Sequence, residues 1–129
     1  MSPDLYALAG AVLLSGAQVG MASVATLRKA GPDWVLGPRD EAFEVPGMGG
    51  RIVRAHRNLL EILPQFVGAL LCVHAADSVS VISAWGAWTF LVARVVYIPA
   101  YLSAIPWLRP FCWQIAFFGV LAIVVDVFV

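Results

Sequence analysis

Four long apolar segments follow one another along the chain, separated by shorter polar stretches. The first runs from Leu5 to Leu27 without a charged residue. A bilayer core of about 30 Å is crossed by about 20 apolar residues in a helix, so each segment is long enough to span a membrane. The pattern predicts four transmembrane helices at about 5–28, 51–76, 79–104 and 110–128.

The stretch between the first two apolar segments, about 29–50, has a different pattern. It contains Gly31-Pro32, Gly37-Pro38 and Pro46-Gly47, with four charged residues between the last two pairs. Glycine and proline at this density indicate a loop. The other connections are short. We therefore expect an all-α integral membrane protein, an up-and-down bundle of four transmembrane helices, formed by residues 1–129 as a single domain.

The basic residues indicate how this bundle is oriented. Six of the eight lie between Leu27 and Leu59, in the first long loop and the helix ends that flank it, and the other two are near the junction of the third and fourth segments. Basic residues are enriched on the cytoplasmic side of membrane proteins. We expect a multi-pass protein with its long first loop in the cytoplasm and both termini on the outer side, and we expect its location to be a bacterial inner membrane.

Composition narrows the class of protein further. Apolar residues make up 61% of the chain and charged residues 12%, whereas a soluble domain carries about 25% charged residues. A small soluble domain and a disordered chain are both excluded by this content. A formal charge of zero argues against nucleic acid as a partner. The two histidines fall on opposite sides of the membrane, which argues against a metal site.

Polar side chains share one face of the second predicted helix. At about 100° per residue they fall within an arc of about 120°: Arg51, Arg54, Arg57, Asn58, Glu61 and Gln65. His56 points the opposite way. On the third predicted helix, Arg94, Tyr97 and Tyr101 also share a face, because they are spaced at i, i+3 and i+7.

Two interpretations of these polar faces are open. Ionisable groups are costly in lipid and are usually paired or functional. In a structural polar seam, Glu61 would pair with Arg94 or Arg57, and the outer arginines would meet lipid phosphates. The count of charges favours a binding site, because four arginines face one glutamate. About three positive charges would then be free to hold a multiply anionic ligand. The side chains expected to close this site are Tyr97, Tyr101 and Arg109.

Two stretches carry a resemblance to a known family. The run RIVRAHRNLLEILPQF, from Arg51 to Phe66, resembles the second-helix signature of the MAPEG family, the membrane-associated proteins of eicosanoid and glutathione metabolism. The run ARVVYIPAYL, from Ala93 to Leu102, is similar to the family's third-helix segment. Chain length, four spans and the long first loop also agree, so the resemblance covers essentially the whole chain.

The resemblance implies a homotrimer of four-helix subunits that holds glutathione, a co-substrate, between adjacent subunits at the cytoplasmic side. The residues that it assigns to glutathione binding are Arg28, Arg51, Arg54, Arg57, Asn58, Glu61, Arg94, Tyr97 and Tyr101. It implies that three of the basic and phenolic groups support the glutathione thiolate: Arg109, Tyr101 and Arg94. Pro99 and Pro110 depart from the family pattern, and we expect Pro99 to bend or break its helix.

The expected function is that of a membrane-embedded glutathione transferase or glutathione-dependent peroxidase. Its partners would be membrane lipid and a hydrophobic small-molecule electrophile. An alternative is a non-catalytic lipid-binding or scaffold member of the same family. A small transporter subunit is a third possibility, but no paired broken helices or repeat halves support it.

Overall fold

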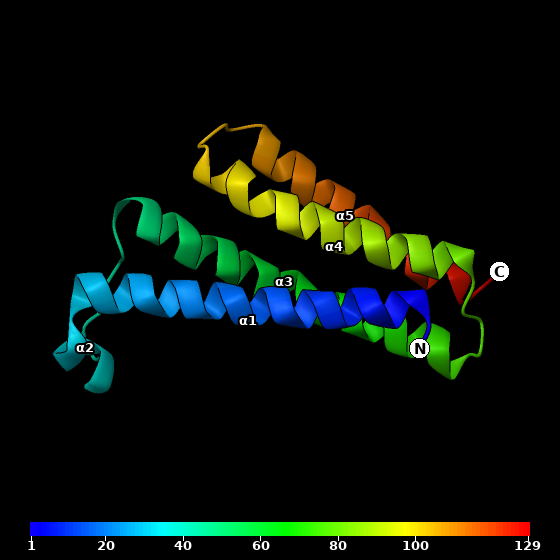
Figure 1. Ribbon diagram of the computed structural model, residues 1–129, viewed down its shortest axis with the longest axis horizontal. Coiled ribbons are helices and arrows are strands. Elements are labelled where there is room, and N and C mark those ends of the chain that lie inside the picture. The colour runs from blue at the N-terminus through cyan, green and yellow to red at the C-terminus, as the bar shows by residue number, and fades with distance from the viewer.

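The computed structural model describes all 129 residues as helices and their connections, without a strand. The helices are α1 (Pro3–Ala30), α2 (Pro32–Leu36), α3 (Gly47–Ala75), α4 (Val81–Leu102) and α5 (Leu108–Asp126). All but the short α2 are long and apolar enough to cross a membrane. They run up and down, which leaves two distinct ends (Figure 1). The loop end carries α2 and the α4–α5 connection, and the termini end carries both chain termini.

The four long helices form two pairs, α1 with α3 and α4 with α5. Figure 1 shows the pairs close together at the termini end and separated at the loop end. The core lies where they meet. There the Phe66 and Phe90 rings stack with centroids 3.9 Å apart, and Ala7 and Ala11 of α1 are completely buried. A pocket at the loop end is lined by residues of α3, α4 and α5.

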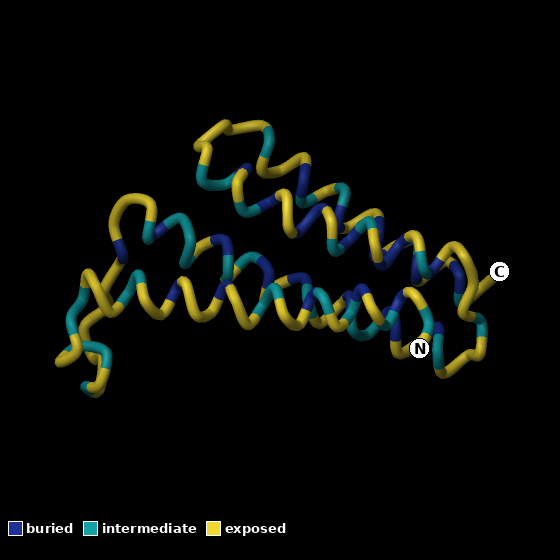
Figure 2. Tube along the Cα trace, in the orientation of Figure 1, coloured by how far each residue is buried: buried dark blue, intermediate teal, exposed yellow.

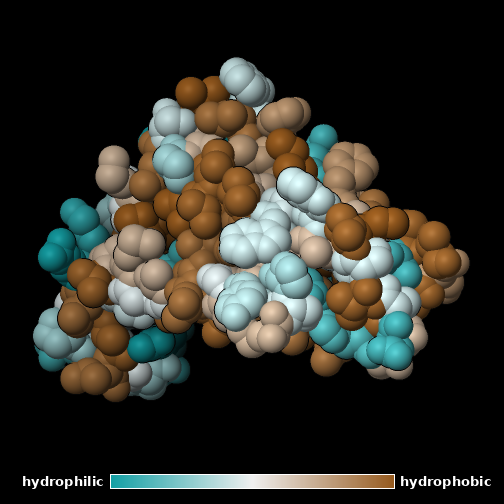
Figure 3. Space-filling view, turned by 45° about the vertical axis from the view of Figure 1, so that its right-hand side comes forward, coloured by the Kyte–Doolittle hydropathy of each residue, from teal (hydrophilic) through white to brown (hydrophobic).

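Exposure follows the pattern of a helix bundle in lipid. Buried positions recur along the inner faces of the long helices, whereas the segment after α1 is mostly exposed (Figure 2). Many large apolar side chains point outward, among them Leu13, Trp85 and Phe118. Hydrophobic side chains also cover much of the face seen in Figure 3. A surface of this kind is stable against acyl chains rather than against water.

Two glycines bring α4 and α5 into close contact. A Cβ atom added to Gly86 would lie 2.6 Å from the Gly119 carbonyl oxygen, and one added to Gly119 would lie 2.6 Å from the Gly86 carbonyl oxygen. Small residues at such crossings allow membrane helices to pack backbone against backbone. This contact accounts for the tight α4–α5 pair.

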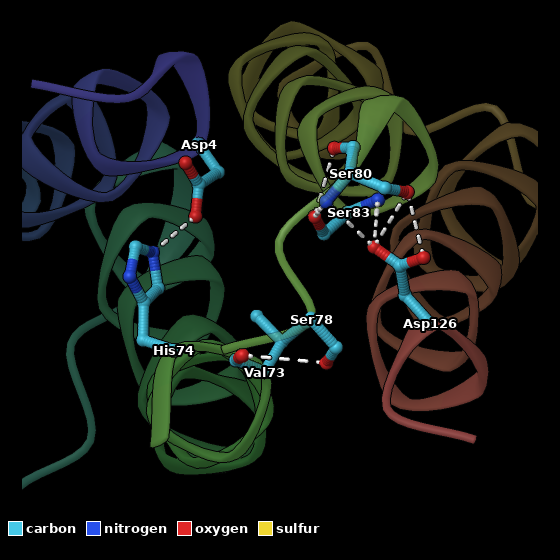
Figure 4. Close-up of polar contacts among 7 residues, drawn as sticks. All are labelled: Asp4, Val73, His74, Ser78, Ser80, Ser83 and Asp126. Carbon is cyan, nitrogen blue, oxygen red and sulfur yellow. Dashed lines mark hydrogen bonds and ion pairs between the residues drawn. The ribbon is translucent and has the colours of Figure 1, made fainter. Parts of the chain in front are cut away.

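Buried carboxylates fasten each pair at the termini end (Figure 4). Asp4 of α1 lies 2.6 Å from His74 Nε2 of α3. Asp126 of α5 accepts hydrogen bonds from the Ser80 hydroxyl, at 2.7 Å, and from the Ser83 amide, at 3.0 Å. The Asp126 carboxylate therefore caps the first turn of α4, where free amides favour a negative charge.

The helix boundaries differ from the predicted ones where glycine and proline occur. The helix expected from residue 51 begins at Gly47. The glycines there allow close packing, because a Cβ on Gly50 would collide with the Val45 carbonyl oxygen. The short helix α2 inside the loop was not predicted. Of the bend or break expected at Pro99, the break is wrong, since α4 continues to Leu102. Pro99 lacks the N–H that would bond to the Val95 carbonyl oxygen, but the turn after it is closed by the Ser103 amide, which donates to the Pro99 carbonyl oxygen at 2.9 Å.

Candidate functional site

A polar pocket of about 440 Å³ opens at the loop end, between α3, α4 and α5. This volume is typical of small-molecule sites. Its lining residues come from all three helices: Arg54, Arg57, Asn58, Glu61, Tyr97, Tyr101, Arg109, Pro110, Trp113 and Gln114. Most of the polar stripe predicted on the second long helix therefore faces the same space as the two tyrosines and Arg109.

Tyr101 is held in the pocket by two arginines. Arg54 Nε donates a hydrogen bond of 3.2 Å to the Tyr101 hydroxyl oxygen. The Arg109 guanidinium carbon lies 5.1 Å from the centre of the Tyr101 ring, within the range of a cation–π contact. Because the hydroxyl oxygen accepts from Arg54, the hydroxyl proton remains available to a second group. Pro99 does not displace Tyr101, whose ring lies 5.7 Å from that of Tyr97.

Arg94 is completely buried and lies behind the pocket wall rather than in it. Its Nη1 donates to Asn58 Oδ1 at 2.9 Å, and Asn58 Nδ2 donates to Glu61 at 3.4 Å. The guanidinium also lies over the Tyr97 ring, 4.2 Å from the ring centre. The expected ion pair between Glu61 and Arg94 or Arg57 is not formed. Asn58, one turn before Glu61, stands between the carboxylate and Arg94, so Arg94 reaches the pocket only through the groups that line it.

Besides Arg94, two more predicted residues lie outside the main pocket. Arg51 Nη1 donates to the Leu102 carbonyl oxygen at 3.0 Å, and Arg51 lines an adjoining hollow that shares Arg54, Tyr101 and Arg109 with the pocket. Arg28 is exposed at the loop end of α1, where it borders a separate hollow. A single subunit therefore brings together most, but not all, of the predicted site residues.

Three pocket residues of α5 were not predicted as site residues: Pro110, Trp113 and Gln114. None of them belongs to the polar faces of the second and third predicted helices from which the site was predicted, and Pro110 is noted above only as a departure from the family pattern. Trp113 stacks on Phe117, with ring centres 5.4 Å apart, and this contact fixes the indole at the pocket wall. Gln114 is the only amide side chain between Arg109 and Asp126, where no residue is charged, and this isolated amide could have indicated that its face of the helix lines the site.

The fold and the pocket define a class of protein: a multi-pass helical membrane protein with a cluster of arginines at one end of its bundle. The family model of the MAPEG family matches residues 5–129, so the chain belongs to the MAPEG family. No curated protein and no solved structure matches it significantly. Family membership and the four apolar helices together establish an integral multi-pass membrane protein.

Proposed function

We propose that the protein is a glutathione-dependent transferase or peroxidase that acts on lipophilic electrophiles. The observation that carries the proposal is the set of charges in the pocket, where Arg54, Arg57 and Arg109 face a single acid, Glu61. Glutathione has two carboxylates, one ammonium group and one thiol. Two guanidiniums match the carboxylates, Glu61 matches the ammonium group, and one guanidinium remains for the sulfur.

The chemistry requires a thiolate. A free thiol has a pKa of about 8.5, and neighbouring cations lower it. Arg109 supplies such a charge, and the Tyr101 hydroxyl, already fixed by Arg54, donates its proton as a hydrogen bond to the sulfur. The sulfur then forms a bond to an electrophilic carbon, and the leaving group departs with the bonding electrons. With a hydroperoxide, the sulfur attacks the terminal oxygen, the O–O bond breaks, and the protonated leaving group departs as an alcohol while the sulfur becomes a sulfenic acid. The thiol of a second glutathione then attacks that sulfur, which forms the disulfide and releases water.

The assembly and location that accompany this proposal follow the family expectation. The subunits form a homotrimer in which Arg28 reaches the pocket of a neighbour. The loop end lies in the cytoplasm, and electrophiles enter from the bilayer. The exposure of Arg28 away from its own pocket is consistent with a role in a neighbouring one.

A non-catalytic lipid-binding role is the second candidate. It is favoured by an apolar hollow of about 370 Å³ on α4 and α5, lined by residues that include Trp85, Trp88 and Val96. An acyl chain would fill such a hollow without any chemistry. In that case, glutathione would not bind, or would bind without reacting.

Calorimetry with glutathione on the purified protein in detergent tests the binding half of the proposal. We expect Arg57→Ala and Glu61→Ala each to weaken binding by about 10-fold or more, since each removes a charged hydrogen-bonding partner. Arg39→Ala, in the loop after α2, is the control and should bind as the wild type does. Absence of binding, or binding indifferent to both pocket variants, would refute the site.

Conjugation of glutathione to a chlorinated nitrobenzene, and reduction of a lipid hydroperoxide, test the catalytic half. We expect at least one of these reactions in the wild-type protein. Normal glutathione binding with neither reaction would leave the lipid-binding function as the better account.

A further inference from the structure

Gln18 is a buried polar side chain that the pocket does not include. It lies near the middle of α1 and is 2% exposed, and neither its amide nitrogen nor its amide oxygen has a hydrogen-bond partner. It continues the buried stripe formed by Ala7, Ala11 and Ala22, so it faces the interior of the bundle. An unpaired amide in a dry interior is costly, and such groups call for a specific explanation.

The packing of α1 on α3 places Gln18 at a definite depth. Two contacts, one near each end, set the register of this antiparallel pair: Asp4 with His74, and Ala25 with the position of a Cβ on Gly49. Gln18 lies about two thirds of the way from Asp4 to Ala25. The matching level of α3 is the turn that contains Asn58, so Gln18 and Asn58 lie at the same depth.

Arg94 has unpaired hydrogen-bond donors at this depth. Its guanidinium is bonded to Asn58 through Nη1 alone, whereas Nε and Nη2 have no partner although both are buried. A carboxamide oxygen is a good acceptor for a guanidinium, directly or through one water molecule. Two free donors and one free acceptor therefore share one level of the bundle interior.

We propose that Gln18 is a positioning residue of the site: its carboxamide oxygen is the second acceptor for Arg94, through one bridging water molecule, and holds the guanidinium against Asn58. The inference rests on the proposed glutathione site, because Asn58 lines the pocket whereas Gln18 and Arg94 do not. The chain Gln18–Arg94–Asn58 connects α1 and α4 to the pocket wall on α3. Its effect on glutathione is indirect, through the orientation of the Asn58 amide.

A double-mutant cycle tests this contact. The variants are Gln18→Leu, Arg94→Met and the two combined, with Gln65→Leu as the matched control because Gln65 is exposed and outside the pocket. Thermal unfolding without ligand and calorimetry with glutathione are measured for each. If Arg94→Met does not fold, Arg94→Lys, which retains the charge without Nε and Nη2, replaces it in the cycle.

We expect Gln18→Leu to lower the unfolding temperature by about 2–6 °C and to weaken glutathione binding by about 2- to 10-fold, the range of a single hydrogen bond. In the Arg94→Met background the same change should have no further effect on either quantity. Gln18→Glu retains an acceptor and should bind glutathione within about twofold of wild type.

Three results would overturn the proposal. Gln18→Leu could leave the unfolding temperature unchanged or raise it, as expected when an unpaired polar group is removed. Its effect could be additive with that of Arg94→Met. Stability could fall while glutathione affinity stays constant, which would show a purely structural role. If wild-type protein does not bind glutathione at all, the proposed function fails, but the stability cycle still decides whether Gln18 and Arg94 interact.

Discussion

Arg94 is the residue whose environment is hardest to explain by packing alone. Its side chain is completely buried, and it has one hydrogen-bonded side chain and one aromatic ring as partners. A buried charge costs several kcal/mol unless hydrogen bonds and a counter-charge offset it. The nearest acid, Glu61, is reached only through Asn58. Such an arrangement is suited to hold the Asn58 amide and the Tyr97 ring in fixed positions at the pocket wall.

Tyr101 provides a test of the chemistry at the level of a single atom. Tyr101→Phe removes the hydroxyl that Arg54 positions while leaving the ring. We expect glutathione affinity to change by less than about threefold and turnover to fall by about 10-fold or more, because the hydrogen bond to sulfur matters most when the thiolate is formed. Steady-state kinetics with glutathione and a chlorinated nitrobenzene measure both effects.

Tyr6→Phe is the matched control, since Tyr6 is 56% exposed near the termini end. It should leave both parameters unchanged. Equal turnover in Tyr101→Phe and wild type would remove Tyr101 from the catalytic step.

Individual residues of the site were predictable where helical periodicity alone determines the face. Arg54, Arg57 and Glu61 share an arc of α3, and the structure places all three in the pocket. The Arg94–Asn58 bond was not predictable, because it depends on how far α4 is shifted along α3. Gln114 was missed for the same reason, since which face of α5 turns toward α3 depends on the α4–α5 crossing.

At the level of helices, the lengths of the apolar segments predicted the four membrane spans. The positions of glycine and proline did not predict where those helices begin and end. Glycine density indicated a loop through Gly50, yet α3 begins at Gly47. Pro99 was expected to bend or break α4, yet the helix is not broken there and ends three residues later. Tertiary contacts outweigh local propensity at both places, and such contacts are not visible in a single sequence.

The α4–α5 crossing yields a prediction about stability. Gly119→Ala places a methyl group 2.6 Å from the Gly86 carbonyl oxygen, so the helices must separate. We expect a loss of about 1–3 kcal/mol in the free energy of unfolding, the usual cost of overpacking. Gly68→Ala, where an added Cβ meets nothing within 4 Å, is the matched control and should be neutral or stabilising. Unfolding in detergent measures both, and equal stability of the two variants would contradict the close crossing.

On the scale of the whole molecule, polar contacts link the helices of each pair at the termini end, and the two pairs diverge at the loop end (Figure 1). Asp4 with His74 ties the α1–α3 pair, and Asp126 caps α4 at the same termini end. The side-chain hydrogen bonds between the two pairs all join α3 and α4: Arg51 to Leu102, Arg54 to Tyr101 and Arg94 to Asn58. The open end is where the arginines gather. The packed termini end therefore holds three helices, α3, α4 and α5, in positions where their polar side chains line one pocket at the loop end.

The outer face of α1 is the surface through which the proposed trimer could form. Gly16 and Gly20 are exposed on this face, and nothing lies within 4 Å of a Cβ added to either. Together with Arg28 they border a shallow hollow. Small residues that face outward in a membrane helix favour close approach by another helix. In the proposed trimer, a neighbouring copy of the chain would pack on this hollow, beside Arg28.

We therefore expect native mass spectrometry of the detergent-solubilised protein to show three copies of the 13.9 kDa chain. Gly20→Leu should shift the population to monomers, because a branched side chain keeps the neighbouring helix away. Val125→Leu, on the exposed face of α5, should leave the trimer intact. If the separated Gly20→Leu monomer still binds glutathione with wild-type affinity, Arg28 of a neighbour is not part of the site. A wild-type monomer in both detergent and lipid nanodiscs would rule out the assembly altogether.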